Sequence, residues 1–230
     1  MIPNFIYNDQ VLPVQLTRRK GMKRMTLRVS KTADAILVSA PPRMPLREVV
    51  HFVGSSRSWI ENQLIKKPPM NQPIYPNMII ALAGKDYLIL HEEKKRRSFE
   101  LKGDSLIIRG PLEHFEWMVM VCLKKNAAER CAYWSGLLSE KLDLVPKKIT
   151  IKDVRGRWGS CSSQGNLNYN WRIILAPEPV LMYLCAHEVS HLRHMNHSAD
   201  FWALVASICP NHLALRAWLK KNGDHLYRYG

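Results

Sequence analysis

The sequence contains no long apolar run and no closely paired cysteines. No apolar stretch approaches the roughly 18 residues that a membrane-spanning helix needs, and the N-terminus lacks a signal-peptide pattern. The five cysteines are odd in number and form no C-x-x-C pair, which argues against a disulfide scaffold. We therefore expect free thiols, a reducing cytoplasmic setting and no membrane partner.

Acidic residues are scarce as well, with 19 Asp+Glu against 34 Lys+Arg and a net charge of +15. The excess is +10 in residues 1–112 and +5 in residues 113–230. A basic surface raises the local concentration of anions, which favours nucleic acid, nucleotide or acidic protein as a partner. Solubility explains such an excess equally well, so charge alone identifies no partner.

The N-terminal half shows strand-like patterns around one amphipathic helix. Alternating apolar residues over 25–38 predict a β-hairpin turning at 31–34, and helical spacing predicts a helix over 45–65. Prolines at 68, 69, 73 and 76 predict a linker. Two further strand regions are expected, over residues 79–90 and 99–109.

The C-terminal half is mostly helical. We expect a long helix over 113–142, strands at 149–151 and 167–175, an apolar helix after Pro177, and short helices over 201–209 and 212–220. Together, the predicted strands and helices indicate an α+β fold with two regions. These are a β-rich N-terminal region over residues 1–112 and a catalytic region over residues 113–230.

The most informative motif lies on the apolar helix. His187 and His191 are four residues apart, so both project from one helix face and can share one Zn²⁺ or another divalent metal. Glu188 follows the first histidine and is placed to act as general base on a water activated by the ion. The pattern predicts a metal-dependent hydrolase.

The third ligand has two candidates. His194 lies near the same helix face, but three ligands along one straight helix would spread over about 10 Å, too far for one ion. His197 lies far enough along for the chain to leave the helix and return to the metal. We therefore favour His197, with Asn196 as a left-handed residue that ends the helix.

A basic segment precedes the metal motif. Residues 147–172 hold six Lys or Arg against the single acid Asp153. Arg155 and Arg157 flank a glycine, and their guanidinium forks suit phosphate oxygens, with Ser160 adding a hydroxyl. An alternative is that these arginines are solvated or pair with carboxylates, and a peptidase would also benefit from one arginine at an oxyanion.

Several segments together resemble a known family, the YgjP-like metallohydrolases. The matching features, in chain order, are the strand around residues 25–29, the helix through Trp59, residues 157–162, the run 167–177, the His187–His191 motif and residues 197–202. This resemblance covers residues 18–220. It implies a minimal zincin-type fold, related to SprT-like and minimal gluzincin metallopeptidases, in which a small sheet and a backing helix support the metal helix.

The resemblance implies His187, His191 and His197 as ligands and Glu188 as the catalytic base. It leaves the substrate open, because zincin geometry suggests peptide hydrolysis whereas the family has also been linked to hydrolysis of nucleoside triphosphates, UTP in particular. The leading interpretation is a zinc metallopeptidase. The alternative is a nucleotide pyrophosphatase with Arg155 and Arg157 on the phosphates, and the third is a nucleic-acid-associated protease.

Overall fold

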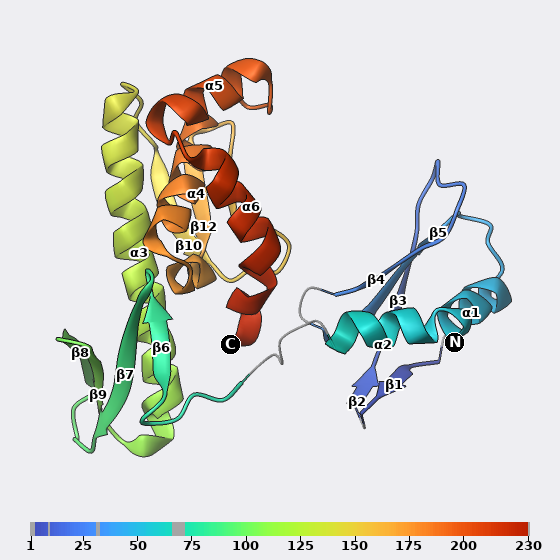
Figure 1. The fold of residues 1–230 in the computed structure, drawn as a ribbon, viewed down its shortest axis with the longest axis horizontal. Coiled ribbons are helices and arrows are strands. Elements are labelled where there is room, and N and C mark those ends of the chain that lie inside the picture. The colour runs from blue at the N-terminus through green and yellow to red at the C-terminus, as the bar shows by residue number, and fades with distance from the viewer. Residues whose placement is uncertain (1–2, 9, 31–32, 66–71, 230) are drawn as a thin grey trace. The chain divides into compact units, whose positions relative to one another are not determined.

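The computed structural model describes residues 3–8, 10–30, 33–65 and 72–229 (Figure 1). By its contacts the chain divides into two compact units, unit 1 up to Gln72 and unit 2 over Pro73–Tyr229. The fold is α+β, as expected. No helix among the described residues is long and apolar enough to cross a membrane.

Unit 1 contains a two-stranded sheet, β1-β2, a three-stranded sheet, β3-β5-β4, and two helices. The strands are β1 (Phe5–Tyr7), β2 (Gln10–Leu12), β3 (Val14–Arg18), β4 (Thr26–Val29) and β5 (Ile36–Ala40). β5 lies at the centre of a three-stranded sheet, parallel to β3 and antiparallel to β4. The alternate residues Ile36, Val38 and Ala40 face a core shared with the helices. The β4–β5 pairing confirms the predicted hairpin, although Lys31 and Thr32 of its turn lie outside the described residues.

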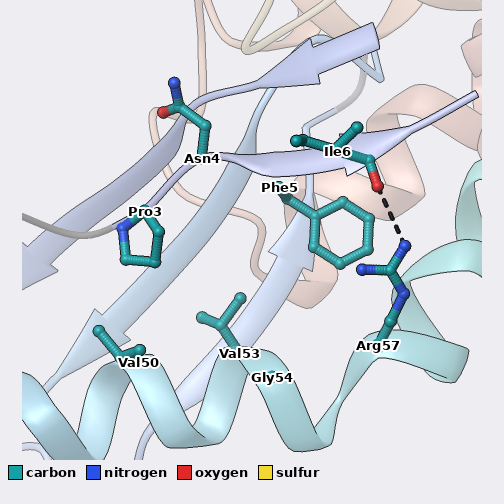
Figure 2. A pocket seen from close by; sticks show the side chains of 8 residues that line it. All are labelled: Pro3, Asn4, Phe5, Ile6, Val50, Val53, Gly54 and Arg57. Carbon is teal, nitrogen blue, oxygen red and sulfur yellow. Dashed lines mark hydrogen bonds between the residues drawn. The ribbon is translucent and has the colours of Figure 1, made fainter. Parts of the chain in front are cut away.

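The helix expected over residues 45–65 is instead two helices, α1 (Leu46–Ser55) and α2 (Arg57–Ile65). The break falls at Ser56, the last residue of a Gly-Ser-Ser sequence of weak helix formers. At the start of α2, Arg57 donates a hydrogen bond of 3.2 Å to the carbonyl of Ile6 and places its guanidinium over the Phe5 ring. Figure 2 shows this contact beside a largely apolar cavity of about 250 Å³ between β1 and α1.

Unit 2 begins with a four-stranded sheet ordered β6-β7-β9-β8. Its strands are β6 (Ile79–Leu82), β7 (Lys85–Glu92), β8 (Ser98–Lys102) and β9 (Ser105–Arg109). A short 3₁₀ turn, η1 (Leu112–His114), leads into the long helix α3 (Phe115–Lys141), which confirms the helix predicted there. Buried residues of β6–β9 share one hydrophobic core with α3 and the helices that follow.

The boundary expected at residue 112 therefore differs from the division in the structure, which falls at Pro73. Besides the shared core, backbone hydrogen bonds join the β6–β7 turn to the later chain. Ala83 donates to the Ile174 carbonyl at 2.6 Å and accepts from the Glu178 amide at 3.2 Å. Strands β6–β9, which the sequence analysis placed in the β-rich N-terminal region, belong to the unit that carries the metal motif. Pro68 and Pro69 of the expected linker lie outside the described residues.

The rest of unit 2 surrounds one apolar helix. The sheet β10-β12-β11 consists of β10 (Lys148–Lys152), β11 (Gly159–Cys161) and β12 (Asn166–Asn170). After η2 (Trp171–Leu175) come α4 (Glu178–Ser190), α5 (Ala199–Ile208), α6 (His212–Asn222) and η3 (Gly223–Arg228). Helix α4 contacts α3, α5, α6 and β11, so it is buried on nearly all sides (Figure 1).

Only the first part of the strand predicted over residues 167–175 is a strand in the structure. β12 ends at Asn170, and the apolar residues after it form the 3₁₀ helix η2. The Asn170 side chain accepts a hydrogen bond from the Arg172 amide at 3.1 Å and so caps this turn. A short run of buried apolar residues fits a strand and a buried helical turn equally well, which explains the error.

Candidate metal centre

Three histidine side chains meet at the end of α4. His187 lies in the last turn of α4 and His191 directly follows the helix. Their ligand nitrogens and that of His197 all lie within 4.8 Å of one another. The Nε2 atoms of His187 and His197 are 3.1 Å apart. The structure thus gathers the three histidines that the sequence singled out.

His197 reaches the cluster because the chain turns sharply after α4. The amides of Leu192 and Arg193 donate to the carbonyls of Val189 and Ser190, which closes the helix without a left-handed residue. The expectation that Asn196 adopts a left-handed conformation is wrong, because its φ is not positive. Asn196 instead accepts a hydrogen bond from the Ser198 amide, at 3.3 Å, just before α5 begins.

His194 contributes through its backbone. Its carbonyl lies 2.9 Å from Nδ1 of His191, so this nitrogen carries the hydrogen and Nε2 is left with a lone pair for the cluster. The imidazole of His194 is not among the clustered side chains. This arrangement agrees with the preference for His197 over His194 as the third member.

Electrostatics favour neutral imidazoles, the form that binds metal. Burial, followed by the nearby His191, His197 and Arg216, lowers the pKa of His187 to about 3. Burial also lowers the pKa of His191. Nδ1 of His187 is buried and has no hydrogen-bond partner among the described residues. A cluster of three imidazole nitrogens, two of them on histidines whose pKa is lowered, fits a divalent transition metal such as zinc.

Two aromatic side chains of α5 hold the imidazoles in place. The buried Phe201 ring stacks on His191, with centroids 4.5 Å apart and planes inclined by 28°. Trp202 stacks on His197 at 5.8 Å and 26°. The guanidinium carbon of Arg216 lies 4.6 Å from the centre of the Trp202 ring. The spacing of the histidines gives no sign of this aromatic support.

The Glu188 side chain is buried and only 4% exposed. Burial raises the pKa of its carboxyl to about 8, although the charge of Arg157 acts in the opposite direction. The carboxylate lies against Gly159 in β11, where an added β-carbon would stand 2.4 Å from Oε1. Sequence reasoning missed β11, because three residues of mixed polarity form no recognisable strand pattern.

The polar residues of the basic segment, residues 147–172, have different surroundings. Arg157 is exposed and acts electrostatically on Glu188, and the Ser160 hydroxyl in β11 accepts a hydrogen bond from Asn168 at 3.4 Å. Arg155 is exposed, and its carbonyl accepts a hydrogen bond from the Tyr227 hydroxyl at 3.2 Å. Of the three residues expected to contact substrate, Arg157 and Ser160 line one small cavity with Gly159, and the Arg155 carbonyl binds the Tyr227 hydroxyl.

Arg172 has a structural role instead. It is 1% exposed, pairs with Asp153 and lies over the ring of Trp171 at 4.4 Å. The one acid of the basic segment is therefore paired with a buried arginine. The exposed positive charge of residues 147–172 is smaller than the count of six basic residues suggests.

The chain was compared with known families, curated sequences and solved structures. The sequence profile of the family described as "YgjP-like, metallopeptidase domain" matches residues 23–222. No curated protein sequence matches the chain. Among solved structures, the metallopeptidase zymogen abylysin of Pyrococcus abyssi is similar over 39% of this chain and 93% of its own, with 18% identity and a TM-score of 0.36.

Proposed function

Because the chain belongs to the YgjP-like metallopeptidase family, we propose that it is a zinc-dependent peptidase. In this proposal His187, His191 and His197 hold the ion and Glu188 is the general base. One observation carries it: three imidazoles converge, and a buried carboxyl follows the first of them in sequence. A zinc ion held there would supply Lewis acidity, which acidifies water and polarises a carbonyl.

The role of Glu188 follows from its surroundings. A pKa of about 8 makes the ionised form of Glu188 a stronger base than an ordinary glutamate, so the carboxylate can take a proton from water and the acid can later donate it to a leaving amine. Contact with Gly159 on one side limits the positions of the carboxylate. Arg157 places a positive charge nearby, suited to an oxygen that becomes negative during acyl transfer.

The position of β11 supports a peptide as substrate. In the sheet order β10-β12-β11, β11 is an edge strand within the described part of the chain. It pairs with β12 through Gly159, Ser160 and Cys161. An extended peptide can add to such an edge through main-chain hydrogen bonds, independently of its side chains. Because Gly159 touches Glu188, a peptide bound there would pass close to the general base.

A nucleoside-triphosphate pyrophosphatase, acting on UTP for example, is the second candidate. The observation in its favour is the exposed Arg157 guanidinium close to Glu188, since an arginine fork suits phosphate oxygens as well as an oxyanion. The same histidines and Glu188 would serve this reaction, with Arg155, Arg157 and Ser160 as phosphate contacts.

A parallel assay separates the two functions. Zinc-reconstituted protein is incubated with a denatured protein and, separately, with each of the four nucleoside triphosphates. A peptidase cleaves the denatured protein and releases no pyrophosphate. Pyrophosphate release without peptide cleavage would overturn the proposal in favour of the second candidate.

Arginine variants test the second candidate independently. If phosphates bind, Arg157→Ala and Arg155→Ala should each weaken binding by about 1.5–3 kcal/mol per lost contact. A triphosphate at a hundredfold excess over Kd should also stabilise the protein by about 2.7 kcal/mol. For a peptidase we expect neither effect beyond weak anion binding that salt suppresses.

A further inference from the structure

Positive charge in unit 1 is concentrated at one end of the sheet β3-β5-β4. Residues 1–72 contain 12 Lys+Arg against 4 Asp+Glu. Since β3 and β5 are parallel and β4 is antiparallel to β5, the end of β3, the end of β5 and the start of β4 lie at the same edge. The loops at this edge carry five exposed basic side chains, which we call the basic end: Arg19, Lys20, Lys23, Arg24 and Arg43.

Hydrogen bonds hold these loops together. The Arg19 amide donates to the Ala40 carbonyl at 3.0 Å, which joins the end of β3 to the end of β5. Nη1 of Arg18 donates to the carbonyls of Pro42 and Met44, each at 2.8 Å. The segment that carries Arg43 is thereby fixed beside the β3–β4 loop. The basic end is a defined surface of the fold and not a set of scattered charges.

The acidic side chains that the structure describes in unit 1 do not neutralise this surface. The described acids of unit 1 have other partners: Asp34 is bound by Ser30 beyond the opposite end of β4, while Glu48 pairs with Arg47 and Glu61 with Arg57. Within the described part of unit 1, no ion pair engages a member of the basic end. An uncompensated group of five cations on a rigid support attracts a polyanion.

We propose that the basic end docks duplex nucleic acid through its phosphate backbone. Three of the five side chains are arginines, whose planar forks bind phosphate oxygens in a bidentate way. On the outer face of the sheet, polar side chains and one further cation surround the exposed Leu37: Gln15, Thr17, Thr26, Arg28 and Ser39. These groups can donate hydrogen bonds to phosphate or sugar oxygens.

The same surface is poorly suited to other polyanions. The two loops contain no aromatic residue, so they offer no platform on which the bases of a single strand could stack. They also lack the aromatic anchors that membrane-surface segments usually place beside their lysines. A duplex, which presents regularly spaced phosphates and buried bases, is the polyanion that this surface matches best.

Fluorescence anisotropy with the zinc-loaded protein of residues 1–230 and a labelled 20-base-pair DNA duplex tests the proposal. The variant Lys23→Ala/Arg24→Ala/Arg43→Ala should weaken binding at least tenfold at 100 mM salt. The slope of log K against log salt should decrease by about three, one for each lost phosphate contact. The three single variants should each weaken binding severalfold, and the charge-preserving variant Lys23→Arg/Arg24→Lys/Arg43→Lys should bind nearly as the wild type does.

A matched control removes the same charge elsewhere. Lys94→Ala/Lys95→Ala/Arg96→Ala deletes three exposed cations from the β7–β8 loop of unit 2 and should change duplex affinity less than about threefold. Equal loss in both triple variants would show that only net charge matters and would overturn the proposal. Tighter binding to phosphatidylserine vesicles, to polyglutamate or to the single strand would also overturn it. An unchanged circular-dichroism spectrum and an unchanged melting temperature show that the basic-end variant keeps its fold.

Discussion

Gly159 and Glu188 are in direct contact, since a β-carbon at position 159 would stand 2.4 Å from Oε1 and 2.7 Å from Cδ of the carboxylate. β11 approaches α4 this closely only because residue 159 has no side chain. The contact joins the edge strand, where we expect substrate, to the general base. Any side chain at position 159 should therefore displace the Glu188 carboxylate.

We predict that Gly159→Ala abolishes most activity while the protein keeps its metal. The methyl group must displace the Glu188 carboxylate, because a 2.4 Å separation is far inside van der Waals contact. The expected decrease in kcat/KM approaches the 10²- to 10⁴-fold typical of a lost general base. Metal content and activity are measured on the same preparation.

Gly156→Ala is the matched control. Its added β-carbon would meet no atom within 4 Å, and its backbone is not left-handed. Activity within about twofold of the wild type is expected. If both alanine variants lost activity equally, general rigidity of the segment and not contact with Glu188 would be the cause.

Glu188→Gln should keep the metal and lose turnover. The amide has nearly the shape of the carboxylate but cannot accept a proton, so kcat should decrease by about 10²- to 10⁴-fold. Metal analysis of the purified variant should give the same stoichiometry as the wild type. Loss of metal would mean that Glu188 is a ligand and not the base.

His197→Ala and His194→Ala should separate a ligand from a residue that supports one. Removing His197 takes away one of three clustered nitrogens and should weaken zinc binding by more than the 10- to 100-fold typical of changes around the ligands. His194→Ala keeps the carbonyl that orients His191, so affinity should change less than tenfold. Equal zinc affinities in a chelator competition would exclude His197 as third ligand.

The stability of the metal-free protein should fall as pH rises above neutrality. The pKa of Glu188 is raised from 4.5 to about 8, so the folded protein holds a proton that the unfolded chain releases between these values. The stabilising contribution is complete below pH 4.5 and is lost as pH rises through 8. Between pH 6 and 9 the wild type should lose on the order of 2 kcal/mol more than Glu188→Gln.

Urea unfolding of both metal-free proteins at the two pH values measures this difference. His187 has the opposite sign, because its pKa is lowered from 6.5 to about 3. The contribution of His187 to the free energy of unfolding is present above pH 6.5 and is lost as pH falls. It therefore changes little over most of the range from pH 6 to 9. Identical pH dependence in wild type and Glu188→Gln would contradict the raised pKa.

Residues with a strong local signal were predictable from the sequence. His187 and His191 follow from their helical spacing, and the buried helix follows from its continuous apolar run. His197 was preferred over His194 because of the dimensions of a helix, and the structure agrees in bringing His197 to the other two. In each case the deciding information lies within about ten residues of chain.

Features that depend on distant contacts were not predictable. β11 is a strand only because β12 and α4 lie beside it, and its three residues carry no periodic pattern. Arg172 resembles a surface cation in the sequence but is buried by Asp153, Trp171 and Tyr227. The boundary at Pro73 likewise follows from packing. The sequence of β6–β9 is strand-like, as in the N-terminal region, but the buried residues of these strands belong to the same core as α3.

The hydrogen bonds between the β6–β7 turn and the start of α4 also constrain motion. Ala83 both donates to Ile174 and accepts from Glu178, and a β-carbon on Gly84 would stand 3.2 Å from Cα of Pro177. The first turn of α4 therefore cannot fray without breaking its contacts with this turn. In amide hydrogen exchange, Ala83 and Glu178 should exchange at similar rates, as one cooperative opening unit. An ion bound at the far end of α4 should slow exchange at both amides.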